Sequence, residues 1–238
     1  LKLLLPSSRV RLPGLRKEVN GPLVRDPKGM ADLAKAAWGP LWTKVERSPG
    51  AEATDKALLG TFDARIPDHL RPSIPPVATM VVIIRDSNNS APGPDGIAFQ
   101  AYRALAEYFA PVLHRFVTAL GEGIVPPNDF NEALLFLISK GGSMTALDMR
   151  PLAVTNTDNR LVSKCMVGAL TDGLDAAIGD HQAGFLAGRE GVGHISASNK
   201  AFYGAVRDKG KAYHILFLDL YKAYDSVHWD WMNITLRE

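Results

Sequence analysis

Residues 217–232, "FLDLYKAYDSVHWDWM", place an acid directly after an apolar run. Residues 215–218 are all large and apolar, which predicts a strand buried on both faces. Asp219 then stands at the end of this strand, where a half-buried charge costs roughly several kcal/mol unless a cation or hydrogen-bond donors compensate it. We therefore expect a partner for Asp219; the simpler alternative is an acid that caps the helix after the strand.

The composition is that of an ordinary globular protein. Of the 238 residues, 46% are hydrophobic and 22% are charged, which argues against global disorder and allows one large domain or two small ones. No apolar run approaches the roughly 20 residues of a membrane span, and Pro6 interrupts the first residues too early for a signal peptide. We predict an intracellular protein of the nucleus or cytoplasm, not secreted and without a membrane partner. The single cysteine, Cys165, excludes an internal disulfide and is expected to line a core.

Charge is distributed unevenly along the chain. Residues 1–50 carry ten Lys and Arg against four Asp and Glu, while the remainder carries seventeen against twenty-one. A basic segment of this kind suits contact with nucleic acid phosphates and equally suits a solvated linker. We therefore divide the chain into residues 1–79, a basic, Pro/Gly-rich lead-in or linker with a short helix at "MADLAKAAWGPLW", and residues 80–238. The first residue is not Met and the last lie in a predicted helix, so we expect a piece of a longer product.

Residues 80–238 alternate between apolar patterns and turn signals. A turn cluster over residues 88–96 leads into one helical stripe over residues 99–120, bent or split at Pro111. Two apolar runs joined by a glycine-containing loop predict a β-hairpin with a long tip over residues 133–156, and Asp158 is expected to cap the next helix. The later pattern predicts a helix over residues 161–178, a loop at "GDHQAGFLAGREG", a helix over about residues 195–206 and a turn at "RDKGK".

Four phrases occur in order along the chain: "SAPGPDGI", "LISKGG…DMRPLAVTNT", "HQAGFLAGR" and "FLDLYKAYDSVHW". Together they resemble the reverse transcriptase of a LINE-like, non-LTR retrotransposon, over residues 80–238. That family usually has "IPK" before the tip of its fingers hairpin, "RPI" after it and "FxDxxKAFDxV" in the palm. One such phrase is weak evidence, whereas four in register make chance a poor explanation. The resemblance implies an α+β right-hand polymerase fragment that holds the fingers and the first part of the palm.

The resemblance also implies roles for residues in the last phrase. Nucleotidyl transfer by such enzymes uses two Mg²⁺ ions, or Mn²⁺ in their place, held roughly 4 Å apart by hard oxygen ligands. Asp219 would be the catalytic acid and would bind both ions together with the backbone carbonyl of Leu220. Tyr224 stands where the family, more often with Phe, places a ring beneath the sugar of the incoming nucleotide. Such a ring collides with a ribose 2′ hydroxyl; the alternative for Tyr224 is a core tyrosine.

Four polar residues complete the predicted site. Lys140 and Arg150 flank the hairpin tip and resemble the family's fingers cations, which grip the triphosphate of the nucleotide. Ser139 departs from the usual Pro, which we expect to loosen the strand end before Lys140. Gln182 and Arg189 are candidates for contact with template or primer, and a surface loop without such contact is an equal alternative. The "SAPGPDGI" phrase is interpreted as turn chemistry that starts the helix at Phe99.

Some motifs and domains typical of the family are not recognisable in these 238 residues. No Asp-Asp pair follows Asp219, no thumb is recognisable, and residues 1–79 hold no endonuclease set. We therefore expect an incomplete catalytic site. The resemblance implies a polymerase, but we expect this chain to be inactive alone. The expected partners are an RNA template, a DNA primer, deoxynucleoside triphosphates and the missing C-terminal palm and thumb of the parent polypeptide.

Two other functions stay open. The chain is alternatively a catalytically inactive remnant or nucleic-acid-binding module, which holds RNA through its fingers and basic lead-in. A group II intron maturase-type reverse transcriptase has a similar palm and is the weaker alternative. The coding sequence beyond Glu238 separates the enzyme from the remnant, because an open frame that reaches an Asp-Asp motif and a thumb favours the enzyme.

Overall fold

The computed structural model describes residues 12–43, 46–62, 65–186, 188–207, 214 and 216–237. The chain forms two compact units. Unit 1 comprises Leu1–Thr43 and Ser73–Ala169, and unit 2 comprises Lys44–Pro72 and Leu170–Glu238. Each unit takes residues from both sides of the boundary predicted between residues 79 and 80, which stays a prediction.

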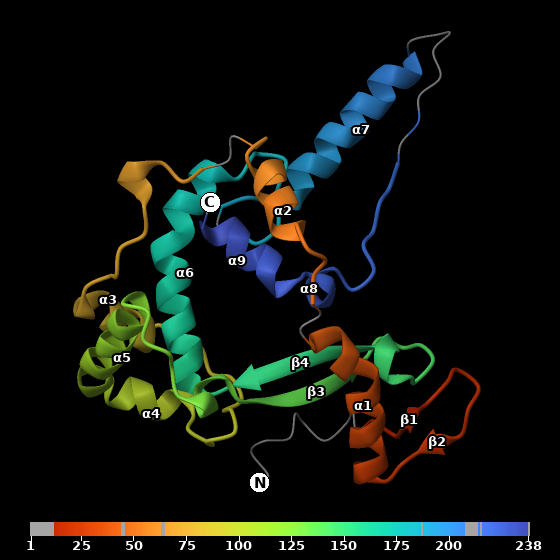
Figure 1. The fold of residues 1–238 in the computed structure, drawn as a ribbon, viewed down its shortest axis with the longest axis horizontal. Helices are drawn as coiled ribbons and strands as arrows, with labels where there is room; N and C mark the ends of the chain where they lie inside the picture. Colours follow the sequence, from red (N-terminus) through yellow and green to blue (C-terminus); the bar gives the residue numbers. More distant parts are fainter. Residues whose placement is uncertain are drawn as a thin grey trace. The chain divides into compact units, whose positions relative to one another are not determined.

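Within its described residues, unit 1 mixes helices with two small antiparallel sheets, in agreement with the predicted α+β class (Figure 1). The pairs are β1 with β2 and β3 with β4. Its main elements are β1 (Leu15–Arg16), β2 (Leu23–Val24), α1 (Pro27–Trp42), α3 (Val77–Arg85), α4 (Phe99–Ala104), α5 (Ala106–Gly121), β3 (Ala133–Ser139), β4 (Met149–Thr155) and the first part of α6 (Thr157–Ala177).

Helix α1 forms where the sequence predicts a short helix. Asp26 caps it, because the Asp26 carboxylate accepts the backbone N–H of Gly29 at 2.6 Å, and Pro27 suits the first helical position. Trp38 is the fully buried residue of this helix, and its indole Nε1 donates to the carbonyl of Ala146 at 3.0 Å. This hydrogen bond ties α1 to the loop between β3 and β4.

The larger core of unit 1 lies among α3, α4, α5 and the start of α6. Its buried side chains are Met80, Ile84, Phe99, Tyr102, Ala106, Ala110, Leu113, Val117, Leu161, Val162 and Cys165. Cys165 therefore lines a core, as predicted, and burial raises the pKa of its thiol. The stripe is not split at Pro111, which was one of the two predicted alternatives: it divides at Leu105, and Pro111 lies inside α5. At Leu105 the backbone leaves the helical region (φ −122°, ψ 34°), and its N–H bonds the carbonyl of Tyr102 in a tighter turn.

The predicted β-hairpin is confirmed. Strands β3 and β4 pair in antiparallel register from Ala133 opposite Thr155 to Ser139 opposite Met149. One face turns toward α1, because Leu137 and Met149 pack in a second core with Leu15. That core also includes Ala146, Leu12, Met30, Leu33, Ala34, Ala37 and Met144.

Within the described residues, unit 2 is helical. Its elements are α2 (Ala51–Leu59), the end of α6, α7 (Gly191–Arg207), α8 (Ala223–Ser226) and α9 (Trp229–Arg237). Helix α7 confirms the helix predicted over about residues 195–206, while most of the turn predicted at "RDKGK" lies outside the described residues.

The buried strand predicted over residues 215–218 is wrong for its described part. Leu216, Phe217 and Leu218 form no strand and are 79%, 88% and 83% exposed; Ile215 lies outside the described residues. A central strand requires neighbouring strands for its hydrogen bonds and for burial of its faces. Among the described residues, no strand pairs with this segment.

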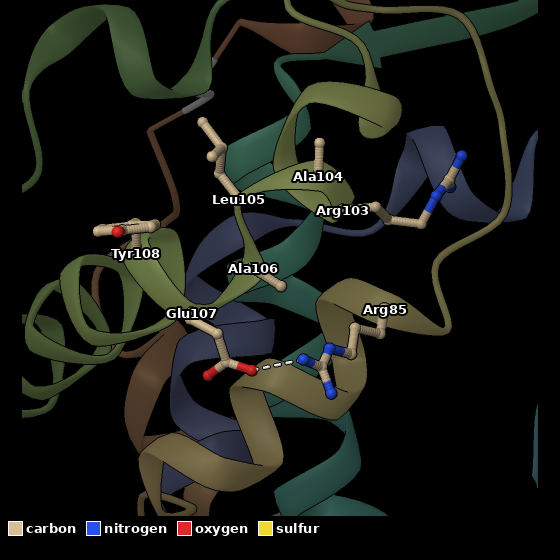
Figure 2. Close-up of a pocket in the computed structure, with 7 residues that line it drawn as sticks. All are labelled: Arg85, Arg103, Ala104, Leu105, Ala106, Glu107 and Tyr108. Atoms are coloured by element: carbon tan, nitrogen blue, oxygen red, sulfur yellow. Dashed lines mark hydrogen bonds and ion pairs between the residues drawn. The ribbon is translucent and has the colours of Figure 1, made fainter.

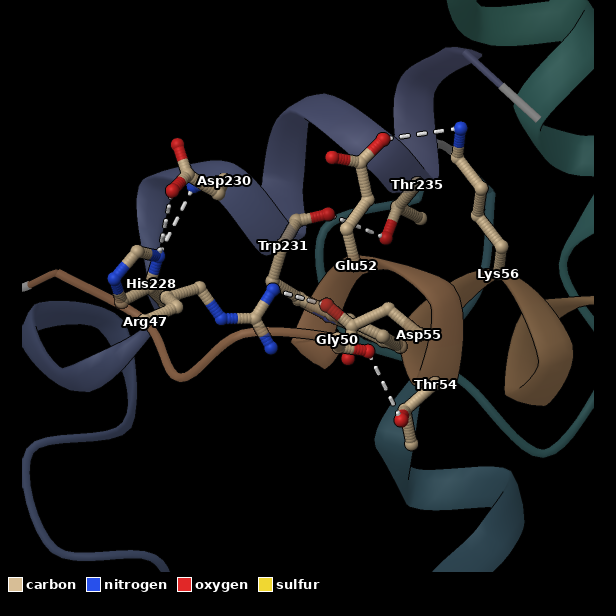
Figure 3. Close-up of polar contacts among 10 residues, drawn as sticks. All are labelled: Arg47, Gly50, Glu52, Thr54, Asp55, Lys56, His228, Asp230, Trp231 and Thr235. Carbon is tan, nitrogen blue, oxygen red and sulfur yellow. Dashed lines mark hydrogen bonds and ion pairs between the residues drawn. The ribbon is translucent and has the colours of Figure 1, made fainter.

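Helix α2 packs against α9 in unit 2, and each of the two helices carries polar contacts of its own (Figure 3). The guanidinium of Arg47 forms an ion pair with Asp55, and this hydrogen bond is the main cause that lowers the pKa of the Asp55 carboxyl. On α9, the backbone N–H of Asp230 donates to Nδ1 of His228 at 3.2 Å. Helix α2 therefore belongs structurally with the C-terminal helix, far from it in the sequence.

Candidate functional site

The tip of the β3–β4 hairpin presents the two predicted cations. Arg150 lies opposite Ile138, and Lys140 follows Ser139, the last paired residue of β3. Side chains alternate between the faces of a strand, so Ile138 and Arg150 project from the face opposite to that of Met149. Both cations are exposed. The hairpin thus brings Lys140 and Arg150 to the same end of one rigid element.

The base of this tip packs on the second core of unit 1, and a backbone hydrogen bond joins its loop to β1. Met149 is 1% exposed, and the N–H of Arg16 donates to the carbonyl of Met144 at 2.9 Å. The loosening that we expected at Ser139 does not occur. Ser139 stays paired with Met149, and its hydroxyl accepts the N–H of Gly141 at 3.1 Å, which a proline side chain cannot do.

The loop that follows α6 carries Gln182 and Arg189. Arg189 is largely buried, and its guanidinium contacts the end of α6: Nε donates to the Asp175 carboxylate at 3.0 Å. It also donates to the carbonyls of Asp175, Ile178, Gly179 and Gln182. A cation in this position satisfies the C-terminal carbonyls that a helix leaves unpaired. The Gln182 amide closes the loop locally by donating to the carbonyl of Gly184 at 3.1 Å.

The segment with Asp219 is extended and exposed. Asp219 itself is exposed, and Leu220 beside it is 76% exposed. Among the described residues no side chain pairs with Asp219, so the partner that we expect for it is not found there. The chain then turns at Lys222, which has a left-handed backbone (φ 48°), and enters the four-residue helix α8 with Tyr224.

Tyr224 meets the loop of Arg189 within unit 2. The rings of Phe185 and Tyr224 pack edge to face, with centroids 5.8 Å apart and planes at 83°. Tyr224 is 76% exposed, so the alternative of a core tyrosine does not hold in this structure. Phe185 is a residue that the sequence reasoning missed, although it lies between the two candidates of its own phrase.

A site for two divalent metal ions needs several oxygen ligands grouped together, and the described residues supply few. No cluster of three or more His, Cys, Asp or Glu side chains able to hold a metal occurs among them. Asp219 and the carbonyl of Leu220 are therefore an incomplete ligand set. Two hard cations a few ångströms apart repel strongly and require more anionic oxygens than these.

The "SAPGPDGI" turn is fixed against the junction of β4 and α6. Asp95 accepts the N–H of Ile97 at 2.9 Å, and Gly96 has φ +71°, which confirms the turn chemistry. The Asn156 side chain accepts the N–H of Asp95 at 3.1 Å. A Cβ on Gly93 would lie 2.5 Å from the backbone nitrogen of Asn156, so only glycine fits this approach. These contacts make the phrase a structural element of unit 1.

A shallow pocket lies where α4 meets α5 (Figure 2). Arg85 and Glu107 point toward each other there and form an ion pair at 2.5 Å. Arg103 turns to the preceding loop and donates to the carbonyl of Ser87 at 2.5 Å. None of the predicted site residues lines this pocket, and its arginines have structural partners.

Comparison with known proteins shows what part of this chain is similar to. Residues 138–237 match the family model described as reverse transcriptase (RNA-dependent DNA polymerase). The match begins at the hairpin tip and includes the loop with Arg189 and the segment with Asp219. The resemblance to a reverse transcriptase that the sequence phrases indicate is thus confirmed.

The chain is also similar to a protein that is named as a transposon protein. The chain is 24% identical, over 231 residues, to a protein of Xenopus laevis named "Transposon TX1 uncharacterized 149 kDa protein". The alignment covers 94% of this chain, and the chain spans 18% of the length of that relative. The predicted likeness to a transposon protein is confirmed as well. In addition, no helix within the described residues has the length and apolar character of a membrane span.

Proposed function

We propose that the chain is the fingers and the start of the palm of an RNA-directed DNA polymerase, the reverse transcriptase of a LINE-like, non-LTR retrotransposon. The observation that carries this proposal is the family match, which runs from the hairpin tip through the segment with Asp219. The substrates would be deoxynucleoside triphosphates, copied from an RNA template onto a DNA primer. Such a protein would act inside the cell, in the nucleus or cytoplasm.

Within this proposal the hairpin binds the nucleotide. Arg150 would grip phosphate oxygens through two parallel hydrogen bonds, and Lys140 would add a single point charge. The packing beneath the tip supports this role, because a rigid base loses little conformational entropy when the triphosphate binds. Tyr224 would contact the sugar and exclude a 2′ hydroxyl. Gln182 and Arg189 would hold their loop against template or primer.

The acid chemistry would be shared with further polypeptide. When bound, two Mg²⁺ ions, or Mn²⁺, would activate the primer 3′ hydroxyl and neutralise the pyrophosphate that leaves the nucleotide, in a two-metal mechanism. Asp219 and the carbonyl of Leu220 would each give one oxygen to that centre. Because these two groups are an incomplete set among the described residues, we propose the remaining palm and a thumb of the parent polypeptide as the partner that completes it.

Primer extension on an RNA template tests this function. A polypeptide of these 238 residues is expected to extend no primer with Mg²⁺ or Mn²⁺, whereas a longer product of the same reading frame extends it and loses activity with Asp219→Ala. Extension by the 238-residue chain that Asp219→Ala abolishes would contradict the proposed sharing of ligands. It would mean that a second copy, or another acid such as Asp225, completes the site.

A nucleic-acid-binding module without chemistry is the second candidate. The absence of a grouped ligand set among the described residues favours it. In that case the longer polypeptide binds RNA with an affinity that falls steeply with salt, yet extends no primer. Equal RNA binding by wild type and Asp219→Ala, together with no extension by either, would select this function.

A further inference from the structure

The loop between α6 and α7 is built to present Phe185. Arg189 fastens the loop to the carbonyls at the end of α6, and Gln182 closes it onto Gly184. The side chains that the sequence singles out here are therefore engaged in holding the loop. Phe185 instead is 92% exposed, the most exposed of the large hydrophobic side chains described. Phe185 therefore takes no part in a core, and the contact that its ring makes with Tyr224 is the feature to explain.

The backbone on both sides of this aromatic contact is strained. Among the described residues, the non-glycine residues with positive φ are Met144, Phe185 and Lys222. Phe185 has φ 66°, a left-handed conformation that is a genuine outlier for a bulky residue. Lys222, with φ 48°, stands two residues before Tyr224. Strained conformations of this kind persist where the surroundings impose them, and they cluster at functional sites.

Helix α8 is too short to hold Tyr224 by itself. It has four residues, and no side chain caps its first turn at Lys222. A single turn forms at a net cost, because few hydrogen bonds repay the ordering of its backbone. Among the described aromatic rings, Phe185 alone packs against the Tyr224 ring. The centroid distance of 5.8 Å and the interplanar angle of 83° match the edge-to-face geometry that aromatic pairs prefer.

We propose that Phe185 is a positioning residue for Tyr224, and that its ring sets the tilt with which Tyr224 meets the sugar of the incoming nucleotide. This inference rests on the proposed function. The loop holds Phe185 in a left-handed conformation, and the edge-to-face contact restrains the Tyr224 ring. The restrained Tyr224 ring excludes the 2′ hydroxyl more strictly than a freely rotating ring does. Phe185 therefore contributes to the choice between deoxyribonucleotides and ribonucleotides without touching either.

The functional test uses the longer polypeptide and the ratio of kcat/KM for a deoxyribonucleotide to that for its ribonucleotide. Phe185→Leu keeps the apolar bulk and removes the ring, and it should lower this ratio roughly two- to ten-fold, the range expected for one aromatic pair. Phe185→Tyr should restore it. In a Tyr224→Val background, Phe185→Leu should change the ratio no further, because the ring that it positions is gone.

The matched control is Phe202→Leu. Phe202 packs against Tyr203 on α7 with the same centroid distance of 5.8 Å, in the same unit. Phe202→Leu should leave the ratio of the two kcat/KM values unchanged. A longer polypeptide that is inactive overturns the proposed function and this inference with it. An active enzyme whose ratio is unaffected by Phe185→Leu overturns this inference alone.

The contact itself is measurable in the 238-residue chain. With 3-fluorotyrosine incorporated, the ¹⁹F resonance lost in Tyr224→Phe is that of Tyr224. Phe185→Leu should shift this resonance because the neighbouring ring current disappears, while Phe202→Leu should leave it in place. An unshifted Tyr224 resonance in Phe185→Leu contradicts the inference whatever the activity.

Discussion

The hairpin tip of unit 1 and the Asp219 segment of unit 2 carry the two halves of the proposed chemistry, and they are supported very differently. Beneath the tip, Met149 is 1% exposed and Trp38 bonds the carbonyl of Ala146. In the other segment, Phe217 is 88% exposed and Leu218 is 83% exposed. Both have sequences that predict strands, yet only the first has a paired strand and a helix to pack on.

This difference teaches that a strand-forming sequence becomes a strand only where its partners exist. β-branched and aromatic residues favour sheets because they pack on neighbouring strands and faces, which is a property of the surroundings. The tip finds these neighbours within the described residues. The Asp219 segment has the side chains for burial and meets no such neighbours there. The variants below test each half of this contrast.

Trp38→Ala should have the strongest effect on stability. Truncating a buried Trp costs about 3–5 kcal/mol, and here the hydrogen bond to Ala146 is lost as well. Urea unfolding followed by circular dichroism measures the free energy, and amide exchange in β3 and β4 locates the loss. The control is Trp229→Ala, a 53% exposed Trp in α9 of unit 2, which should change stability by about 0.5 kcal/mol. If Trp38→Ala and Trp229→Ala lowered the free energy of unfolding equally, the hairpin tip would be no better supported by packing than unit 2.

Arg150→Ala should act on catalysis and leave folding alone. In the longer polypeptide, kcat/KM for the nucleotide should fall by an amount equivalent to about 2–4 kcal/mol, with template affinity barely changed. Because Lys140 makes a point-charge contact, Lys140→Ala should cost less. Arg115→Ala, another exposed Arg of unit 1, is the control and should behave as wild type. Normal nucleotide kinetics in Arg150→Ala would exclude the hairpin as the triphosphate grip.

Tyr224→Val should relax sugar selection by less than Arg150→Ala lowers catalysis. Removal of the ring eliminates one steric clash, so ribonucleotide use should rise relative to deoxyribonucleotide use by roughly 1–3 kcal/mol. Tyr224→Phe keeps the ring and should retain selection. Competition between the two nucleotides in primer extension gives the ratio directly. Unchanged selection in Tyr224→Val would mean that the exposed ring has no part in the site.

Local sequence patterns predicted two features of unit 1 correctly, the β3–β4 hairpin and the buried cysteine. The hairpin follows from two apolar runs around a glycine-containing loop, and the buried Cys165 follows from helical spacing. The division at Leu105 was misplaced at Pro111, since contacts with a distant loop, such as the bond from Arg103 to Ser87, compete with the local proline signal. Asp158 lies in the first turn of α6 and not before it.

The sequence identified several residues of the candidate site, but it did not predict the contacts that they make. For Arg189 the sequence left contact with template or primer and a plain surface loop as equal alternatives, and its observed bonds to the end of α6 depend on where the chain returns. A known helix end close to a later Arg would have been the signal for this capping role. Phe185 was missed because an aromatic between glycines predicts neither burial nor exposure. Only the loop geometry shows that it meets Tyr224.

Charge removal at Asp158 should produce a small change that depends on pH. Burial is the main cause that raises the pKa of the Asp158 carboxyl, and Asp95 and Asp129 add to the effect. The folded state therefore holds the proton more tightly than the unfolded state, so the free energy of unfolding falls as pH rises from the ordinary value, about 3.9, through the raised one.

Asp158→Asn keeps a side-chain oxygen for the N–H of Asn159 and removes this penalty. The variant should match wild type below the ordinary pKa and become progressively more stable than wild type above it, as urea unfolding at a series of pH values will measure. A stability difference between Asp158→Asn and wild type that stays constant across the pH series would contradict the raised pKa of this carboxyl, because the penalty arises only when the buried group ionises.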